Sequence, residues 1–215
     1  MRADIERYWR ELRDTMDEMP YGVLSRVAEA LLQCRERGGT IFIAGNGGSA
    51  ATASHFACDL AKGTQCAGEA PFRVMPLTDN MPLLTAWAND VSYEQVFAQQ
   101  LAPLVRPGDT LVAISASGLS PNVLAAARVA RQQGAHVIAL TGASGGKLHR
   151  LASLTVRVPS PVIEQVEDAH LMIAHSLCVT LREAIRLQAS DRGATTSATL
   201  GLRAVDLADD ATVAL

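Results

Sequence analysis

No apolar run in this sequence approaches the roughly 20 residues that a membrane-spanning helix requires. Basic blocks are also missing, and the net charge is −3, so a nucleic-acid-binding surface is not indicated. The amino-terminal stretch is charged and helical in pattern and lacks the apolar centre of a signal peptide. We therefore expect a cytoplasmic protein that binds neither membranes nor nucleic acids.

Cysteine is scarce, with four residues in a chain of 215. None of them forms a C-x-x-C pair, so neither a zinc ribbon nor a redox motif is suggested. Buried or incidental thiols in a reducing cytoplasm are the expected state. With 48% hydrophobic and 19% charged residues, the composition is typical of a soluble globular protein with one sizeable core.

Short apolar runs alternate with helical patterns along most of the chain. The expected strands are residues 40–45, 72–77, 109–117, 136–142 and 154–159. This alternation predicts a parallel sheet covered by helices on both faces, a three-layer α/β fold. Two amphipathic helices precede it in residues 1–38. The α/β domain spans 39–187, and from residue 188 to 215 the helical period fades, which predicts a mobile tail or a partner-docking segment.

A glycine-rich loop, Gly-Asn-Gly-Gly-Ser at 45–49, ends the first expected strand and opens a helix. Glycines let the backbone approach an anion, and the first helical N–H groups are unpaired. The loop alone is equally consistent with a tight turn that binds nothing. A dinucleotide fingerprint is rejected because no strand ends about twenty residues later. A P-loop at 142–147 is rejected because Leu148 follows its lysine and the spacing is one residue short.

A second loop, "ISASGLSPN", also follows a strand and opens a helix. It carries Ser115, Ser117 and Ser120, whereas capping of the helix would explain only one serine. Hydroxyls and backbone N–H groups at a helix start form a neutral phosphate cradle that needs no lysine. Ligands of open α/β sheets bind at this end of the strands, so the sequence predicts a phosphate site here.

Titratable side chains recur at helical spacing in two segments. His55 and Asp59 are four residues apart and share a helix face. Glu167 and His175, eight residues apart on the last expected helix, also share approximately one face. A histidine and a carboxylate at such spacing usually perform acid–base chemistry or bind a metal. His170, in an apolar helix, is interpreted as a core or interface residue.

These motifs, in this order, resemble the SIS domain, a fold that binds phosphosugars. "GNGGSxxxxxHFxxDL", "AND" at 88–90, "ISASGLSPNV", "ALTG" and "EDAHLMIAHSL" resemble in particular the phosphoheptose isomerases, over residues 20–187. That family converts sedoheptulose 7-phosphate to D-glycero-D-manno-heptose 7-phosphate. The tail has no counterpart in this resemblance.

The resemblance implies a role for each matching position. It assigns catalysis to Asp59, Glu167 and His175. It implies that the substrate is bound by Asn46, Gly47, Gly48, Ser49, His55, Asn89, Asp90, Ser115, Ala116, Ser117, Ser120 and Glu167. It implies a divalent metal, expected to be zinc, on His55, Asp59, Glu167 and His175. It also implies a homotetramer with active sites at subunit interfaces, to which the two amino-terminal helices contribute.

Two residues depart from the family's pattern. Asp59 stands where the isomerases carry Glu, and Glu167 stands where they carry Gln. Both positions lie where the substrate meets the chemistry, so an isomerase of another phosphosugar is an open alternative. A non-catalytic sensor or adaptor, of the type that binds a replication initiator, is a further alternative. Such relatives lose the acid and the His of the last helix, so Asp59 and His175 favour an enzyme.

Overall fold

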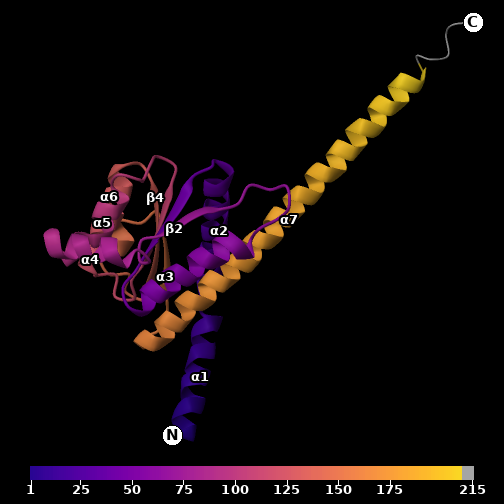
Figure 1. Ribbon diagram of the computed structural model, residues 1–215. Helices are drawn as coiled ribbons and strands as arrows, with labels where there is room; N and C mark the ends of the chain where they lie inside the picture. Colours follow the sequence, from indigo (N-terminus) through magenta and orange to yellow (C-terminus); the bar gives the residue numbers. More distant parts are fainter. Residues whose placement is uncertain (210–215) are drawn as a thin grey trace, which may run out of the picture.

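The computed structural model describes the backbone of residues 1–209 and the side chains of residues 1–192. Helices cover both faces of a central sheet, and two long helices project from this body (Figure 1). The helices are α1 (Arg2–Asp17), α2 (Tyr21–Glu36), α3 (Gly48–Cys58), α4 (Met81–Asp90), α5 (Val96–Leu101), α6 (Pro121–Gln132) and α7 (Ile163–Asp209). A π-helical turn, η1 (Asp59–Gly63), continues α3, and two 3₁₀ turns, η2 (Tyr93–Gln95) and η3 (Leu148–Arg150), lie in connections.

All five expected strands are present and all pair in parallel. They are β1 (Thr40–Ala44), β2 (Arg73–Pro76), β3 (Thr110–Ile114), β4 (His136–Gly142) and β5 (Leu154–Val158). Their order across the sheet is β2-β1-β3-β4-β5, with Ile41 opposite Thr110 and Leu111 opposite Val137. The chain leaves β1 toward one side and β3 toward the other, so the strand order reverses between them. Ligands bind at such a switch point in open α/β sheets.

Alternate residues of each strand enter two separate cores, as the period of two in a strand requires. Ile41 and Ile43 of β1 pack toward α2, α3 and α7. Phe42 and Ala44 pack toward α4, α5 and α6 on the other face. The predicted three-layer α/β architecture is therefore confirmed.

The amino-terminal helical part is present as expected, and α1 extends beyond the sheet (Figure 1). Leu12 and Thr15 are its only buried residues. The Tyr8 hydroxyl donates to Asp168 Oδ2 at 2.5 Å, and Gln165 Nε2 donates to Glu11 Oε2 at 3.1 Å. These bonds fasten one side of α1 to the start of α7.

The last helix is longer than the sequence pattern predicts. The helical period fades at residue 188, yet α7 continues to Asp209 and points away from the body (Figure 1). No proline interrupts residues 188–209, and alanine and leucine favour helix even without a buried face. That the tail moves or docks a partner stays a prediction, and residues 210–215 lie outside the described part. None of the helices described here combines the length and apolar composition needed to cross a bilayer.

Candidate active site

The two loops singled out in the sequence lie side by side at the carboxyl edge of the sheet. One follows β1 and the other follows β3, and these strands are hydrogen-bonded neighbours. Each loop opens a helix, α3 or α6, on an opposite face of the sheet. The fold therefore directs two positively polarised helix ends toward one place.

The glycines of the first loop are required by its geometry. Gly47 has φ +54°, a conformation that other residues rarely adopt. A Cβ on Gly45 would lie 2.7 Å from the Ser49 carbonyl oxygen. No side chain caps α3, so the N–H groups of its first turn are available to an anion. Gly47 and Gly48 are exposed and Ser49 is buried.

The serine loop presents its hydroxyls as a group. Ser115 Oγ and Ser120 Oγ lie 3.0 Å apart, and Ser117 Oγ accepts from the Leu119 N–H at 3.2 Å. Ser120 is the N-cap residue of α6 but makes no capping bond with its side chain. Capping therefore does not account for this serine. Ser117 is exposed and Ala116 is half-buried.

The "GASGGK" segment, rejected as a P-loop, supports the serine loop from behind. The Gly118 carbonyl accepts from the N–H groups of Lys147 and Leu148 at 2.9 and 3.0 Å. A Cβ on Gly118, where φ is +64°, would lie 2.2 Å from the Gly145 carbonyl oxygen. Gly146 is equally restricted, because a Cβ there would lie 2.4 Å from the Ser117 carbonyl oxygen. The two backbones touch so closely that only glycine fits.

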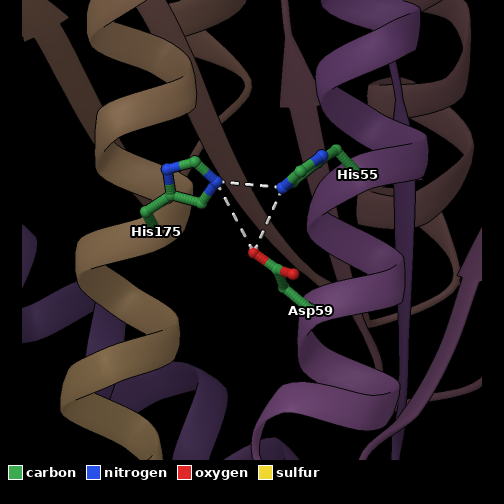
Figure 2. Close-up of side chains that lie close together, drawn as sticks. All are labelled: His55, Asp59 and His175. Carbon is green, nitrogen blue, oxygen red and sulfur yellow. Dashed lines mark hydrogen bonds and ion pairs between the residues drawn. The ribbon is translucent and has the colours of Figure 1, made fainter.

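A third feature brings two helices together at His55, Asp59 and His175 (Figure 2). His55 and His175 Nε2 atoms lie 2.9 Å apart. Asp59 Oδ2 lies 3.4 Å from His55 Nε2 and 3.8 Å from His175 Nε2. Asp59 begins η1, and π-helical turns inside helices occur frequently at functional sites. The Asp59 carboxylate therefore faces two imidazoles.

The donor set of this cluster fits a divalent metal. One ligand atom from each residue lies within 4.8 Å of the others. Two imidazole nitrogens and a carboxylate oxygen are donors that Zn²⁺ and similar ions accept in tetrahedral sites. Burial raises the pKa of the neighbouring Cys178 thiol to about 12, and the negative charge of Asp59 adds to that effect. Cys178 is therefore a neutral thiol beside the cluster.

Glu167 lies at a different level of the same helix pair. Its Oε2 would be 2.7 Å from a Cβ on Gly48, so the carboxylate rests on the first turn of α3. Eight residues separate it from His175, which corresponds to about 12 Å along a helix. Three of the four predicted metal ligands thus converge, and Glu167 is not among them in the described residues.

Asn89 and Asp90 end α4 in an exposed position. Asn89 Nδ2 donates to Asp90 Oδ1 at 2.8 Å, and neither side chain bonds to another predicted site residue in the described part of the chain. Two residues absent from the predicted site lie closer to the loops. Tyr93 and Asn122 both hydrogen-bond to Asn46. Asn122 belonged to the quoted "SPN" motif, whereas Tyr93 had no sequence signal beyond its position after "AND".

His170 is a core residue, as expected. It is 1% exposed, and neither ring nitrogen makes a hydrogen bond of ordinary geometry, although the Thr141 backbone is near. Burial lowers the pKa of His170 to about 4. The ring is therefore neutral at physiological pH, and His170 is separate from the His55 cluster.

Comparison with known proteins gives the family of the chain. A family model described as "SIS domain" matches residues 5–142. The phosphoheptose isomerase of Rhodospirillum rubrum is 44% identical over 148 residues, 69% of this chain and 78% of that protein. The chain belongs to the SIS-domain phosphoheptose isomerases.

Other members of the family agree over a longer span. Phosphoheptose isomerase 1 of Campylobacter jejuni is 35% identical over 181 residues, 83% of this chain and 97% of that protein. The structure of phosphoheptose isomerase GmhA from Neisseria gonorrhoeae matches with a TM-score of 0.79 at 32% identity, covering 85% of this chain and 98% of that chain. The resemblance predicted from the motifs is confirmed, and the chain is a phosphosugar isomerase.

Proposed function

We propose that this phosphosugar isomerase interconverts sedoheptulose 7-phosphate and D-glycero-D-manno-heptose 7-phosphate through an enediol. The observation that carries the proposal is the convergence of His175 of α7 with His55 and Asp59. His55 lies on α3, which begins at the glycine-rich loop, and Asp59 lies on η1, which continues α3. The same helix pair thus offers anion-binding groups at one end and acid–base groups further along. An elongated substrate with a phosphate at its far end suits this arrangement.

The phosphate is held by neutral groups. Ser115, Ser117 and Ser120 supply hydroxyl donors, and the first turns of α3 and α6 supply backbone N–H groups. Asn89 and Asp90 are proposed to orient the open-chain sugar through its hydroxyls. Gly47, Gly48, Ser49 and Ala116 remain proposed contacts of the loops with the substrate.

The reaction moves a proton between two adjacent carbons. A base removes a proton from the carbon next to the carbonyl, and the C–H electrons form the enediol double bond. An acid then returns a proton to the former carbonyl carbon, and a hydroxyl proton moves between the two oxygens. Asp59 or Glu167 and His175 perform these transfers. Oδ2 of Asp59 and Nε2 of His175 can serve one substrate carbon pair because they lie 3.8 Å apart.

The proposed metal ligands are the three convergent residues His55, Asp59 and His175, with zinc as the ion. Glu167, which the resemblance implied as a fourth ligand, rests on Gly48 in this structure, and its role as a ligand stays a prediction. When bound, such an ion would supply a Lewis acid that polarises the carbonyl and hydroxyl oxygens. A bound ion would also hold the two imidazoles and Asp59 in place, because their donor atoms already lie within 4.8 Å of one another. We further propose a cytoplasmic homotetramer in which the active sites lie at subunit interfaces.

The decisive experiment is proton exchange followed by NMR. Purified protein is incubated in D₂O with sedoheptulose 7-phosphate beside the His175→Ala and His136→Ala variants; the latter removes an exposed imidazole at the opposite end of β4. We expect deuterium next to the carbonyl and formation of an aldose phosphate with wild type and His136→Ala, and neither with His175→Ala.

Each other result has a definite meaning. Exchange without the aldose product assigns a different phosphosugar, the alternative that Asp59 and Glu167 left open. No exchange, with added zinc and with chelator alike, rejects sedoheptulose 7-phosphate as the substrate. Wild-type exchange in His175→Ala rejects the assigned mechanism.

A further inference from the structure

A network of amides joins the two anion-binding loops. Asn46 Nδ2 donates to Asn122 Oδ1 at 2.9 Å, and Asn122 Nδ2 donates back to Asn46 Oδ1 at 2.8 Å. The Tyr93 hydroxyl donates to the same Asn46 Oδ1 at 3.1 Å. Asn46 belongs to the glycine-rich loop, Asn122 to the first turn of α6, and Tyr93 to η2, so three separate segments meet at one pair of side chains.

The orientation of both amides is determined by a backbone donor. The Val123 N–H donates to Asn122 Oδ1 at 2.9 Å, and a backbone N–H can only face an oxygen. Asn122 must therefore turn its oxygen toward Val123, and Asn46 must present its NH₂ group to that oxygen. The reciprocal bond from Asn122 Nδ2 follows from this arrangement, and no alternative flip satisfies all the donors.

This bonding uses nearly the whole capacity of the Asn46 side chain. Its oxygen accepts two hydrogen bonds, which is the number of its lone pairs, and one of its two amide hydrogens is engaged. Asn122 is 1% exposed, and its oxygen also accepts two bonds. Little of either amide is left for a sugar, although the sequence placed Asn46 among the substrate ligands.

We propose that Asn46 and Asn122 are positioning residues that lock the glycine-rich loop onto the amino-terminal end of α6 and so set the spacing of the phosphate cradle. The Tyr93 hydroxyl bonds to the same pair of amides and so fixes the segment that follows Asn89 and Asp90 against them. The inference rests on the proposed function, because it requires that the serine loop hold the phosphate. Loss of these hydrogen bonds then weakens phosphate binding at the serine loop, although Asn46 itself lies in the glycine-rich loop.

Inorganic phosphate separates positioning from direct sugar contact, because it fills the cradle and has no sugar hydroxyls. Its dissociation constant is measured by ³¹P NMR, beside that of sedoheptulose 7-phosphate, for wild type, Asn46→Ala, Tyr93→Phe and Ser117→Ala. We expect Asn46→Ala to weaken both ligands by the same factor, about tenfold, the equivalent of one hydrogen bond in the cradle. Tyr93→Phe should act in the same direction and less strongly.

A charge-matched pair of variants completes the test. Asn46→Asp places an acceptor against Asn122 Oδ1 and should reproduce the loss, whereas Asn80→Asp adds the same charge in the loop before α4. Asn80 accepts the Leu83 N–H at 3.0 Å, which a carboxylate also does, so Asn80→Asp should bind phosphate normally. Adding Asn122→Ala to Asn46→Ala should cause no further loss, because the pair acts as one unit.

The outcomes separate this inference from the proposed function. If Asn46→Ala weakens the sugar phosphate but leaves inorganic phosphate unchanged, Asn46 is a direct sugar ligand and the lock is rejected. If Ser117→Ala leaves both affinities unchanged, the phosphate assignment itself fails. Thermal melting of each variant verifies folding, and Tyr93→Phe, which removes one exposed hydroxyl, remains decisive should Asn46→Ala unfold.

Discussion

At the scale of single residues, the shorter acid at position 59 still reaches both imidazoles. Asp59 lies on the π-helical turn η1, where the widened backbone displaces the residue from an ideal helical path. Its Oδ2 lies within 3.8 Å of both Nε2 atoms. Although Asp59 is one methylene shorter than the family's Glu, its carboxylate therefore still lies beside both His55 and His175. The other departure, Glu167, rests on Gly48 and keeps its carboxylate away from the three convergent atoms.

The metal content of variants tests this residue geometry. Purified wild-type protein should contain a divalent ion, and His55→Ala should lose it because one of the donors is removed. Inductively coupled plasma mass spectrometry of both proteins, with His136→Ala as the control, measures the content. An unchanged stoichiometry in His55→Ala would contradict the site. Loss of the ion in Glu167→Ala would establish Glu167 as a ligand, and full retention would restrict the set to three residues.

His170 should make the protein sensitive to acid. Its pKa is about 4 in the folded state, below the ordinary value near 6.5, so the unfolded chain takes up the proton first as pH falls. The contribution of neutral His170 to the free energy of unfolding is fully present above pH 6.5 and is lost as the pH falls from 6.5 to 4. The neutral, buried ring accounts for about 2 kcal/mol of unfolding free energy lost between pH 7.5 and 5.

Denaturant unfolding of wild type and His170→Leu at those two pH values measures this contribution. The variant should lose about 2 kcal/mol less stability on acidification, because leucine does not titrate. The other histidines are the same in both proteins and cancel in the difference. An identical pH dependence for the two proteins would show that His170 does not cause the sensitivity.

At the scale of elements, the serine loop depends on a second loop that contains none of the predicted site residues. The backbone of residues 142–147 packs against it at positions where only glycine fits. Gly118→Ala should therefore lower stability by a few kcal/mol, since it combines a positive φ with a backbone collision. It should also abolish phosphate binding, because Ser117 and Ser120 flank the displaced residue.

Gly68→Ala is a matched control for that substitution. Gly68 also has a positive φ, of +81°, but nothing lies within 4 Å of its Cβ position. It should show only the conformational cost of about 1 kcal/mol and bind phosphate normally. Denaturant unfolding and the ³¹P titration measure both effects. Equal behaviour of the two variants would refute the proposed support of the serine loop.

At the scale of the whole molecule, large apolar side chains remain exposed on the two projecting helices. Ile5 and Trp9 of α1 are 60% and 64% exposed, and Met172, Val179 and Leu187 of α7 are also exposed. Ile5 and Trp9 are four residues apart and therefore share one face of α1. These exposed apolar side chains would be buried by the proposed tetramer. The hydrogen bond from Tyr8 to Asp168 fastens α1 to α7 beside Glu167.

Light scattering after size exclusion tests the oligomer. Wild type should elute with the mass of a tetramer, and the double substitution Ile5→Glu, Trp9→Glu should give smaller species because it places charge in the interface. Leu104→Glu, which alters an exposed leucine beyond α5, is the control and should leave the mass unchanged. A monomeric wild type, or a tetramer that survives the double substitution, would contradict this use of α1.

The sequence by itself determined the strands, the layers, the two anion-binding loops and the pairing of His55 with Asp59. These features depend on local periodicity, on turn residues and on spacing within one helix, all of which are written along the chain. The resemblance of the motifs predicted the family, and the comparisons with known proteins confirm it. The structure also places His55 and Asp59 on one face of the helix, as their spacing predicts.

Only the tertiary structure decided which distant groups meet. It placed His175 against His55, set Glu167 on Gly48, and paired Asn46 with Asn122, which is 76 residues away. The physical reason is that these outcomes depend on the packing of helices across the sheet edge, and side-chain reach between separate elements has no signature in the order of residues.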